Sequence, residues 1–222
     1  MYKKLFTIFI ALSVFSSIKW ICCKKQKHSL RTSKKWTKTP HARTFEHLML
    51  TGPSQLDNKE IKKAILVGLS TINESIIDDL TVTGNLTACN SIFSITVATG
   101  TMNFDQCTIN NQLRGTGAFN SENSRFKLVF ITGNFQAYDS TFDSITIVAN
   151  DTALFENSNA HSLLVAKNGN DKQNTVTIYL KGKSNIDTIE FEEGINGTVI
   201  LENTNSTVSN IKNGKIKKLH KN

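Results

Sequence analysis

Four carboxylates recur at one position of a repeated pattern in this 222-residue chain, and they are the first candidates for chemistry: Asp105, Glu122, Glu156 and Glu202. Clustered carboxylates carry out general acid and base steps in polysaccharide hydrolysis. Cys89, Tyr138 and Lys181 take the same position in other repeats. This pattern predicts an outward acidic stripe, and we favour a solubilising face over a polysaccharide-active site.

Other reactive groups are scattered. The histidines are His28, His41, His47, His161 and His220, and the only arginines within the repeats are Arg114 and Arg125. We find no nucleophile motif, phosphate loop or metal-ligand spacing. The cysteines, Cys22, Cys23, Cys89 and Cys107, match no disulfide framework and no zinc knuckle. We therefore expect no catalytic residue, no metal, no cofactor and no structural disulfide.

The positive charge of the chain is confined to its start. The formal net charge is +8, from 26 Lys and Arg against 18 Asp and Glu. Residues 1–43 contain eleven Lys and Arg and no acid, so residues 44–222 are slightly acidic. The basic character is therefore a property of the N-terminus and not of the repeats, which makes nucleic acid an unexpected partner.

The first segment, residues 1–23, is expected to direct export. Two lysines precede the apolar run Leu5–Ile18, which is typical of a secretory signal peptide. The run extends past Lys19 to Cys23, so an uncleaved membrane anchor is an alternative. A bacterial lipoprotein site, with lipid on Cys22, is a third. We expect the protein in the cell envelope, periplasmic or membrane-anchored, or secreted.

Two further segments precede the repeats. Residues 24–53 form a basic arm whose first part, Lys24–Arg43, has eight Lys and Arg and no acid. Such a segment is expected to be flexible and to contact an anionic membrane or cell wall, or to act as a solvated spacer. Residues 54–69 are expected to form a short capping helix, because Ile61, Ile65 and Leu69 recur at helical spacing.

Residues 70–216 contain a repeat of about sixteen to eighteen residues, followed by a basic tail at 217–222. One column of the repeat is polar and turn-forming: Glu74, Asn90, Gln106, Asn123, Asp139, Asn157 and Asn203. Asn and Asp tolerate left-handed backbone angles, so this column predicts stacked turns joined by a polar ladder. The next column is small: Ser75, Ser91, Cys107, Ser124, Ser140, Ser158 and Thr204.

Large and small residues compensate each other between repeats. The expected core aromatics are Phe93, Phe104, Phe119, Phe126, Phe135, Phe142 and Phe155. Phe119 and Phe126 flank Ser121, and Phe155 is flanked by Ala153 and Ala160. Packing at crystal-like density requires such compensation. Alternating triplets, such as Leu80–Val82, Ile95–Val97, Leu128–Phe130 and Ile145–Ile147, predict short strands with one buried face.

These patterns predict an all-β, single-stranded parallel β-helix of about seven to nine coils, right-handed, with the N-terminal helix as its cap. A repeat this short cannot bury its apolar face alone, and stacking supplies the missing partner. Glycine-punctuated coils such as Leu80–Leu86 (LTVTGNL) and Asn196–Leu201 (NGTVIL) resemble those of bactofilins over Gly68 to about Gly214. The resemblance implies a right-handed β-helix that polymerises. The coils are also similar to small exported repeat proteins of intracellular bacteria.

The expected function is therefore a structural, surface or adhesion module, exported or tethered to the envelope, that contacts a protein or polysaccharide surface. The first alternative is a polymer-forming scaffold that self-associates end to end. The second alternative is a polysaccharide-active enzyme that uses the acidic stripe.

Overall fold

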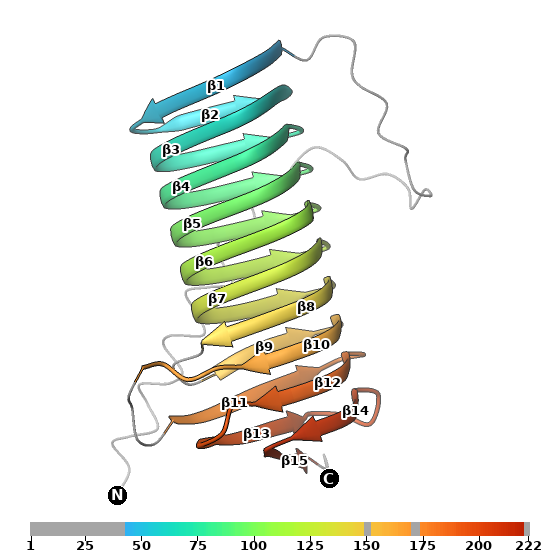
Figure 1. Ribbon diagram of the computed structural model, residues 1–222. Helices are drawn as coiled ribbons and strands as arrows, with labels where there is room; N and C mark the ends of the chain where they lie inside the picture. Colours follow the sequence, from blue (N-terminus) through green and yellow to red (C-terminus); the bar gives the residue numbers. More distant parts are fainter. Residues whose placement is uncertain (1–42, 149–151, 170–173, 220–222) are drawn as a thin grey trace, which may run out of the picture. The chain divides into compact units, whose positions relative to one another are not determined.

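The computed structural model describes residues 43–148, 152–169 and 174–219, and every element in these ranges is a strand. Figure 1 shows the strands stacked along one axis. They are β1 (Arg43–Thr51), β2 (Ser54–Asp57), β3 (Lys59–Asn73), β4 (Ile76–Cys89), β5 (Ile92–Asp105), β6 (Thr108–Glu122), β7 (Arg125–Tyr138), β8 (Thr141–Val148), β9 (Thr152–Glu156), β10 (Asn159–Val165), β11 (Asn174–Lys181), β12 (Asn185–Phe191), β13 (Ile195–Leu201), β14 (Thr207–Lys212) and β15 (Gly214–Lys218).

All pairings are parallel and each strand pairs with its copy one coil later, so the predicted parallel β-solenoid is confirmed. Ile61, Ile77 and Phe93 are register partners on successive rungs. The solenoid has about ten turns, more than the seven to nine expected. The count rises because strands also form on both sides of the regular repeats, at Arg43 and at Lys218.

Each coil has two faces. The strands β3–β7 run across both and bend at a glycine, whereas later coils use separate strands for each face. We call the side with β1, the first halves of β3–β7, β8, β10, β12 and β14 the first face. At the bend, Gly100 has φ of 123°, and a Cβ there would lie 2.1 Å from the carbonyl oxygen of Gly84. Only glycine fits both the angle and this close approach.

The opposite end of each coil is the predicted turn column. Glu74, Asn90, Gln106, Asn123, Asp139 and Asn157 all have left-handed φ values between 47° and 53°. Their backbone N–H groups donate to the coil that follows, for example from Asn90 to the carbonyl of Asp105 at 3.0 Å. Asn203 does not share this backbone angle. Its side-chain Oδ1 instead accepts hydrogen bonds from the backbone N–H groups of Asn205 and Ser206.

The hydrogen-bonded side-chain ladder lies in the small column next to the turns. The hydroxyls of Ser75, Ser91, Ser124, Ser140, Ser158 and Ser184 are buried. The Oγ atom of each serine accepts a hydrogen bond from a backbone N–H of the preceding coil. For example, Ser140 accepts from the N–H of Ser124 at 3.2 Å. Ser124 also donates to the carbonyl of Glu122 at 2.7 Å. The column ends on Ser206 and not on the predicted Thr204, which is exposed.

Between the faces lies a core in which all seven predicted phenylalanines are buried. Phe126 and Phe142 stack with ring centroids 5.0 Å apart and an interplanar angle of 8°. In one column a large residue pairs with a small one, as Phe104 does with Ser121 and Phe155 with Ala137, and this leaves room for the stacked rings of the other columns. Interleaved rings of this kind fill the core without voids.

The N-terminal cap differs from the expectation. Residues 54–69 contain no helix and form β2 and most of β3. The helical spacing of Ile61, Ile65 and Leu69 is accidental, because Ile61 is buried while Leu69 is 55% exposed. The sheet also begins earlier than expected, since β1 lies inside the segment 24–53 that we assigned to the arm. At the other end, β15 reaches Lys218.

The phase of two strands also differs. Leu80 and Val82 point into the core, but their register partners are Thr96 and Ala98, so Ile95 and Val97 point outward. The same holds in β7, where Val129 is buried and its neighbours Leu128 and Phe130 are exposed. Shifting a strand by one residue exchanges its two faces. The apolar triplets therefore predicted the two-residue alternation of these strands correctly, but not which of the alternating residues face the core.

Candidate functional site

The predicted acidic stripe exists as a register column on the opposite side, the second face, which consists of the second halves of β3–β7 with β2, β9, β11, β13 and β15. Asp105 pairs with Glu122, Glu122 with Tyr138, and Tyr138 with Glu156. Asp105 and Glu156 are half-buried and Glu122 is exposed. The column brings Asp105 and Glu122 to neighbouring rungs and separates Glu156 from them by the tyrosine.

Tyr138 lies between two acidic residues of this column, Glu122 and Glu156. Partial burial raises the pKa of the Tyr138 phenol, and the negative charges of Glu156 and Glu122 raise it further. Its hydroxyl donates to Oε1 of Gln136 at 3.3 Å. Beyond Glu156, Lys181 forms an ion pair with Glu202 at 3.1 Å. The carboxylate of Glu202 is therefore paired with a lysine.

The remaining reactive side chains do not converge. The described residues contain no group of three or more His, Cys, Asp and Glu that could hold a metal ion. His161 Nδ1 lies 2.8 Å from Asp187 Oδ2, with both side chains exposed.

Burial raises the pKa of the Cys107 thiol to about 12. The expectation of no disulfide is wrong for Cys89, which is disulfide-bonded.

The sequence predictions for the N-terminus fall on residues that the structure does not describe. They comprise the signal peptide or anchor at 1–23, the lipidation site at Cys22 and the arm up to residue 42. Within the described ranges, no helix is long and apolar enough to cross a membrane.

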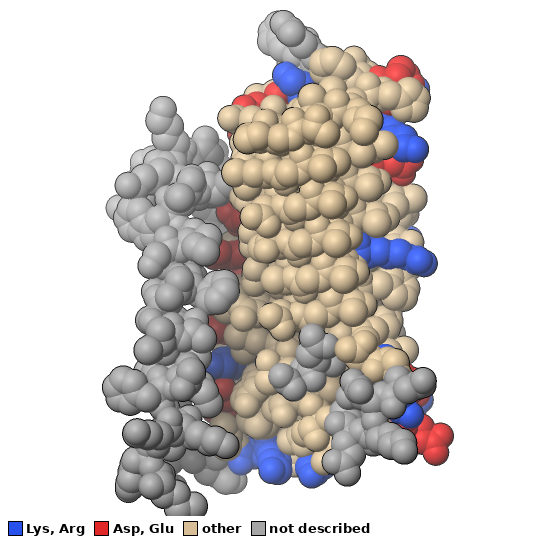
Figure 2. All heavy atoms as spheres, turned by 90° about the vertical axis from the view of Figure 1, so that its left-hand side faces the viewer, with Lys and Arg blue, Asp and Glu red and all other residues tan. Residues whose placement is uncertain are grey.

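The most unusual surface lies on the first face, where the outward side chains of β5–β8 form what we call the outer grid. Each strand contributes three residues: Ile95, Val97 and Thr99; Gln112, Arg114 and Thr116; Leu128, Phe130 and Thr132; Ser144, Thr146 and Val148. Four of them are large apolar side chains with 37–43% of their surface exposed. Figure 2, viewed from the side where the strands bend, shows that the bend itself also has a broad field without charged residues across the middle rungs.

A shallow groove runs through the outer grid along the solenoid axis. Arg114 and Phe130 stand on one side, the threonines Thr99, Thr116 and Thr132 stand on the other, and Gly115 lies in the floor. The guanidinium of Arg114 lies 5.4 Å from the centre of the Phe130 ring. Cation–π contacts of this length hold an exposed guanidinium in place.

Sequence reasoning missed the outer grid, although a signal for it was present. In most coils the residue five positions after the small column is buried. Leu80 holds this position after Ser75, and Val129 holds it after Ser124. The same count from Ser91 reaches Thr96 and therefore places Ile95 and its second neighbour Val97 outside. The distance from the regular turn column therefore indicates which residues of a strand point inward, and the apolar triplets do not.

Comparisons with models of protein families, with curated protein sequences and with solved structures gave no match for this chain.

Proposed function

We propose that this protein is a non-catalytic interaction module, exported or tethered to the cell envelope, which contacts its partner through the outer grid. The observation that carries the proposal is the exposure of four large apolar side chains on one sheet, Ile95 and Val97 on β5 and Leu128 and Phe130 on β7, on either side of β6. Exposed apolar side chains grouped on a protein surface mark contact sites.

The rigidity of the sheet supports this role. Strands β5–β7 are each paired on both sides, and their ends are fixed by the turn column and the serine ladder. A surface that is already ordered loses little conformational entropy when it binds. The export signal predicted for residues 1–23 and the basic arm support a location where the solenoid projects from an envelope surface.

The test is binding of the labelled full chain to purified cell-wall polysaccharide and to intact cells. Leu128→Glu places a charge in the outer grid and is expected to reduce binding at least about tenfold. Gln136→Glu adds the same charge on the second face and is the matched control. Equal binding by both variants would count against the outer grid. Release of reducing ends that depends on Asp105 and Glu122 would show that the protein is an enzyme.

A second candidate function, an end-to-end polymer, is favoured by the open ends of the solenoid. Among the described strands, β1 pairs only with β3, and β14 only with β12. Phe45, Leu48 and Leu50 at one end, and Val208 and Ile211 at the other, are only partly buried against the core. Open strand edges are templates for pairing with another chain.

Sedimentation velocity at increasing protein concentration tests the polymer. If the ends stack, Leu48→Lys should restore the monomer, because it places a charge in the contact, while Met49→Lys, on the exposed side of the same strand, should not. A monomer at all concentrations would exclude this second function.

A further inference from the structure

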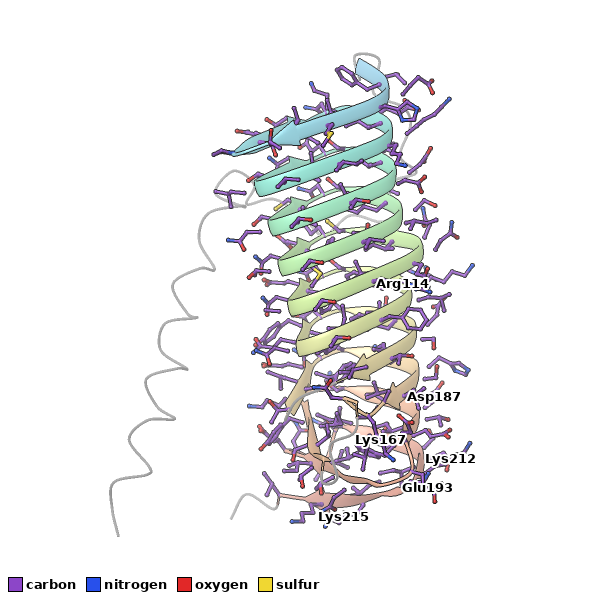
Figure 3. All side chains as sticks on the ribbon, turned by 60° about the vertical axis from the view of Figure 1, so that its left-hand side comes forward. Arg114, Lys167, Asp187, Glu193, Lys212 and Lys215 are labelled. Carbon is purple, nitrogen blue, oxygen red and sulfur yellow. The ribbon has the colours of Figure 1, made fainter. Side chains whose placement is uncertain are left out.

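Arg114 is the only charged residue in the outer grid, and it lies near the middle of the stack (Figure 3). Within the described part of the chain, it forms no ion pair. Its guanidinium is instead held over the ring of Phe130 at 5.4 Å. Stacking uses the face of the guanidinium and leaves the N–H groups on its edge available to a ligand.

The surroundings of Arg114 limit the class of ligand. A planar guanidinium with free N–H groups binds a carboxylate in a bidentate manner. Across the groove, Thr99, Thr116 and Thr132 present hydroxyl groups on successive rungs, and each hydroxyl both donates and accepts hydrogen bonds. Rungs are about 4.8 Å apart, which suits a ligand that repeats polar groups along its length. The ligand is thus anionic, hydroxyl-bearing and extended.

Two other classes of partner fit less well. An extended peptide binds a sheet by pairing with an open strand edge, but β5, β6 and β7 are paired on both sides. A phospholipid surface is recognised by several neighbouring cations, and the outer grid supplies one. An acidic polysaccharide has the required carboxylates and hydroxyls, and its sugar rings have apolar faces that can pack on Val97 and Phe130.

We propose that the groove of the outer grid binds a linear acidic polysaccharide, with Arg114 holding a carboxylate and Thr99, Thr116 and Thr132 contacting the sugar hydroxyls. Because it names the partner of the same surface, this inference rests on the proposed interaction function.

The test uses the full chain and a soluble polygalacturonate, with its methyl ester as the uncharged probe, measured by calorimetry. The eleven Lys and Arg of residues 1–43 also attract polyanions, so roughly 0.5 M salt is used to screen them. Arg114→Gln is expected to weaken binding about tenfold or more. Arg125→Gln removes the same charge from another column of the first face and should leave affinity unchanged.

A second pair of variants tests the geometry. Arg114→Lys keeps the charge and loses the planar fork, so affinity should be intermediate. Phe130→Leu removes the stacking partner and should weaken binding several-fold. Equal losses in Arg114→Gln and Arg125→Gln, equal affinity for the ester, or no binding of polygalacturonate would each overturn the inference. The interaction function would survive these outcomes if Leu128→Glu still reduced binding to cells.

Discussion

Thr96 occupies the core position directly across from Leu80 on the neighbouring rung, and both side chains are buried with exposures of 0% and 1%. The Thr96 hydroxyl has no hydrogen-bond partner among the described residues. A buried hydroxyl without a partner destabilises the fold, because it has lost its hydrogen bonds to water.

Thr96→Val should therefore stabilise the solenoid by about 1 kcal/mol, since valine has nearly the same shape and no hydroxyl. The free energy of unfolding, measured by urea denaturation, checks this. Thr99→Val is the control on the same strand, where the side chain is exposed, and should change stability by less than about 0.5 kcal/mol. A destabilised Thr96→Val protein would contradict the absence of a partner.

The serine ladder offers a second comparison. Ser124 Oγ accepts from the backbone N–H of Cys107 at 3.0 Å, so Ser124→Ala leaves a buried donor unpaired and should cost about 1–3 kcal/mol. Ser121 is equally buried, yet its hydroxyl lacks a partner within the described residues. Ser121→Ala should therefore leave the melting temperature unchanged or raise it. Equal losses in the two variants would argue against the ladder.

Glycine at the bend is required by contact as well as by backbone angle. In Gly100→Ala the new Cβ would lie 2.1 Å from a backbone oxygen of the previous coil, and the φ of 123° is itself strained for alanine. We expect the free energy of unfolding, measured by thermal denaturation, to fall by roughly 3 kcal/mol or more. Gly52→Ala also has positive φ, but nothing lies within 4 Å of its Cβ. The free energy of unfolding of Gly52→Ala should therefore fall by only about 1–2 kcal/mol.

Cys107 replaces serine in the ladder, and its S–H donates to the carbonyl of Asp105 at 3.3 Å. Burial raises its thiol pKa from 9.0 to about 12, so the native state favours the protonated form. The resulting stability is fully present below pH 9 and is lost as pH rises from 9 towards 12, by up to roughly 1.4 kcal/mol per pH unit. Comparing urea denaturation of wild type and Cys107→Ser at pH 8 and pH 10.5 measures this difference.

The same burial predicts a chemical result. At pH 8 the folded chain should not react with iodoacetamide at Cys107, and urea should restore the reaction. Peptide mapping by mass spectrometry distinguishes this thiol from the other cysteines. Fast labelling in the folded protein would contradict the position of Cys107 in the core.

The amino-acid sequence by itself determined the parallel solenoid, the turn column and the identity of the core aromatics. These follow from local rules: Asn90 and Asp139 tolerate left-handed backbone angles, and Phe104 needs a small partner such as Ser121. It also brought the acidic column together, because a constant coil length aligns equivalent residues. The handedness of the winding stays a prediction.

Tertiary structure decided which side of each strand is buried and what happens at the ends. Ile95 and Thr96 both fit a strand, and the apolar alternation does not choose between them; pairing with Leu80 directs Thr96 inward and Ile95 outward. Helical spacing at Ile61, Ile65 and Leu69 was overridden because residues 59–73 gain a full set of backbone hydrogen bonds by pairing with β4. The outer grid exists for the same reason, because the long-range register places Arg114 beside Phe130.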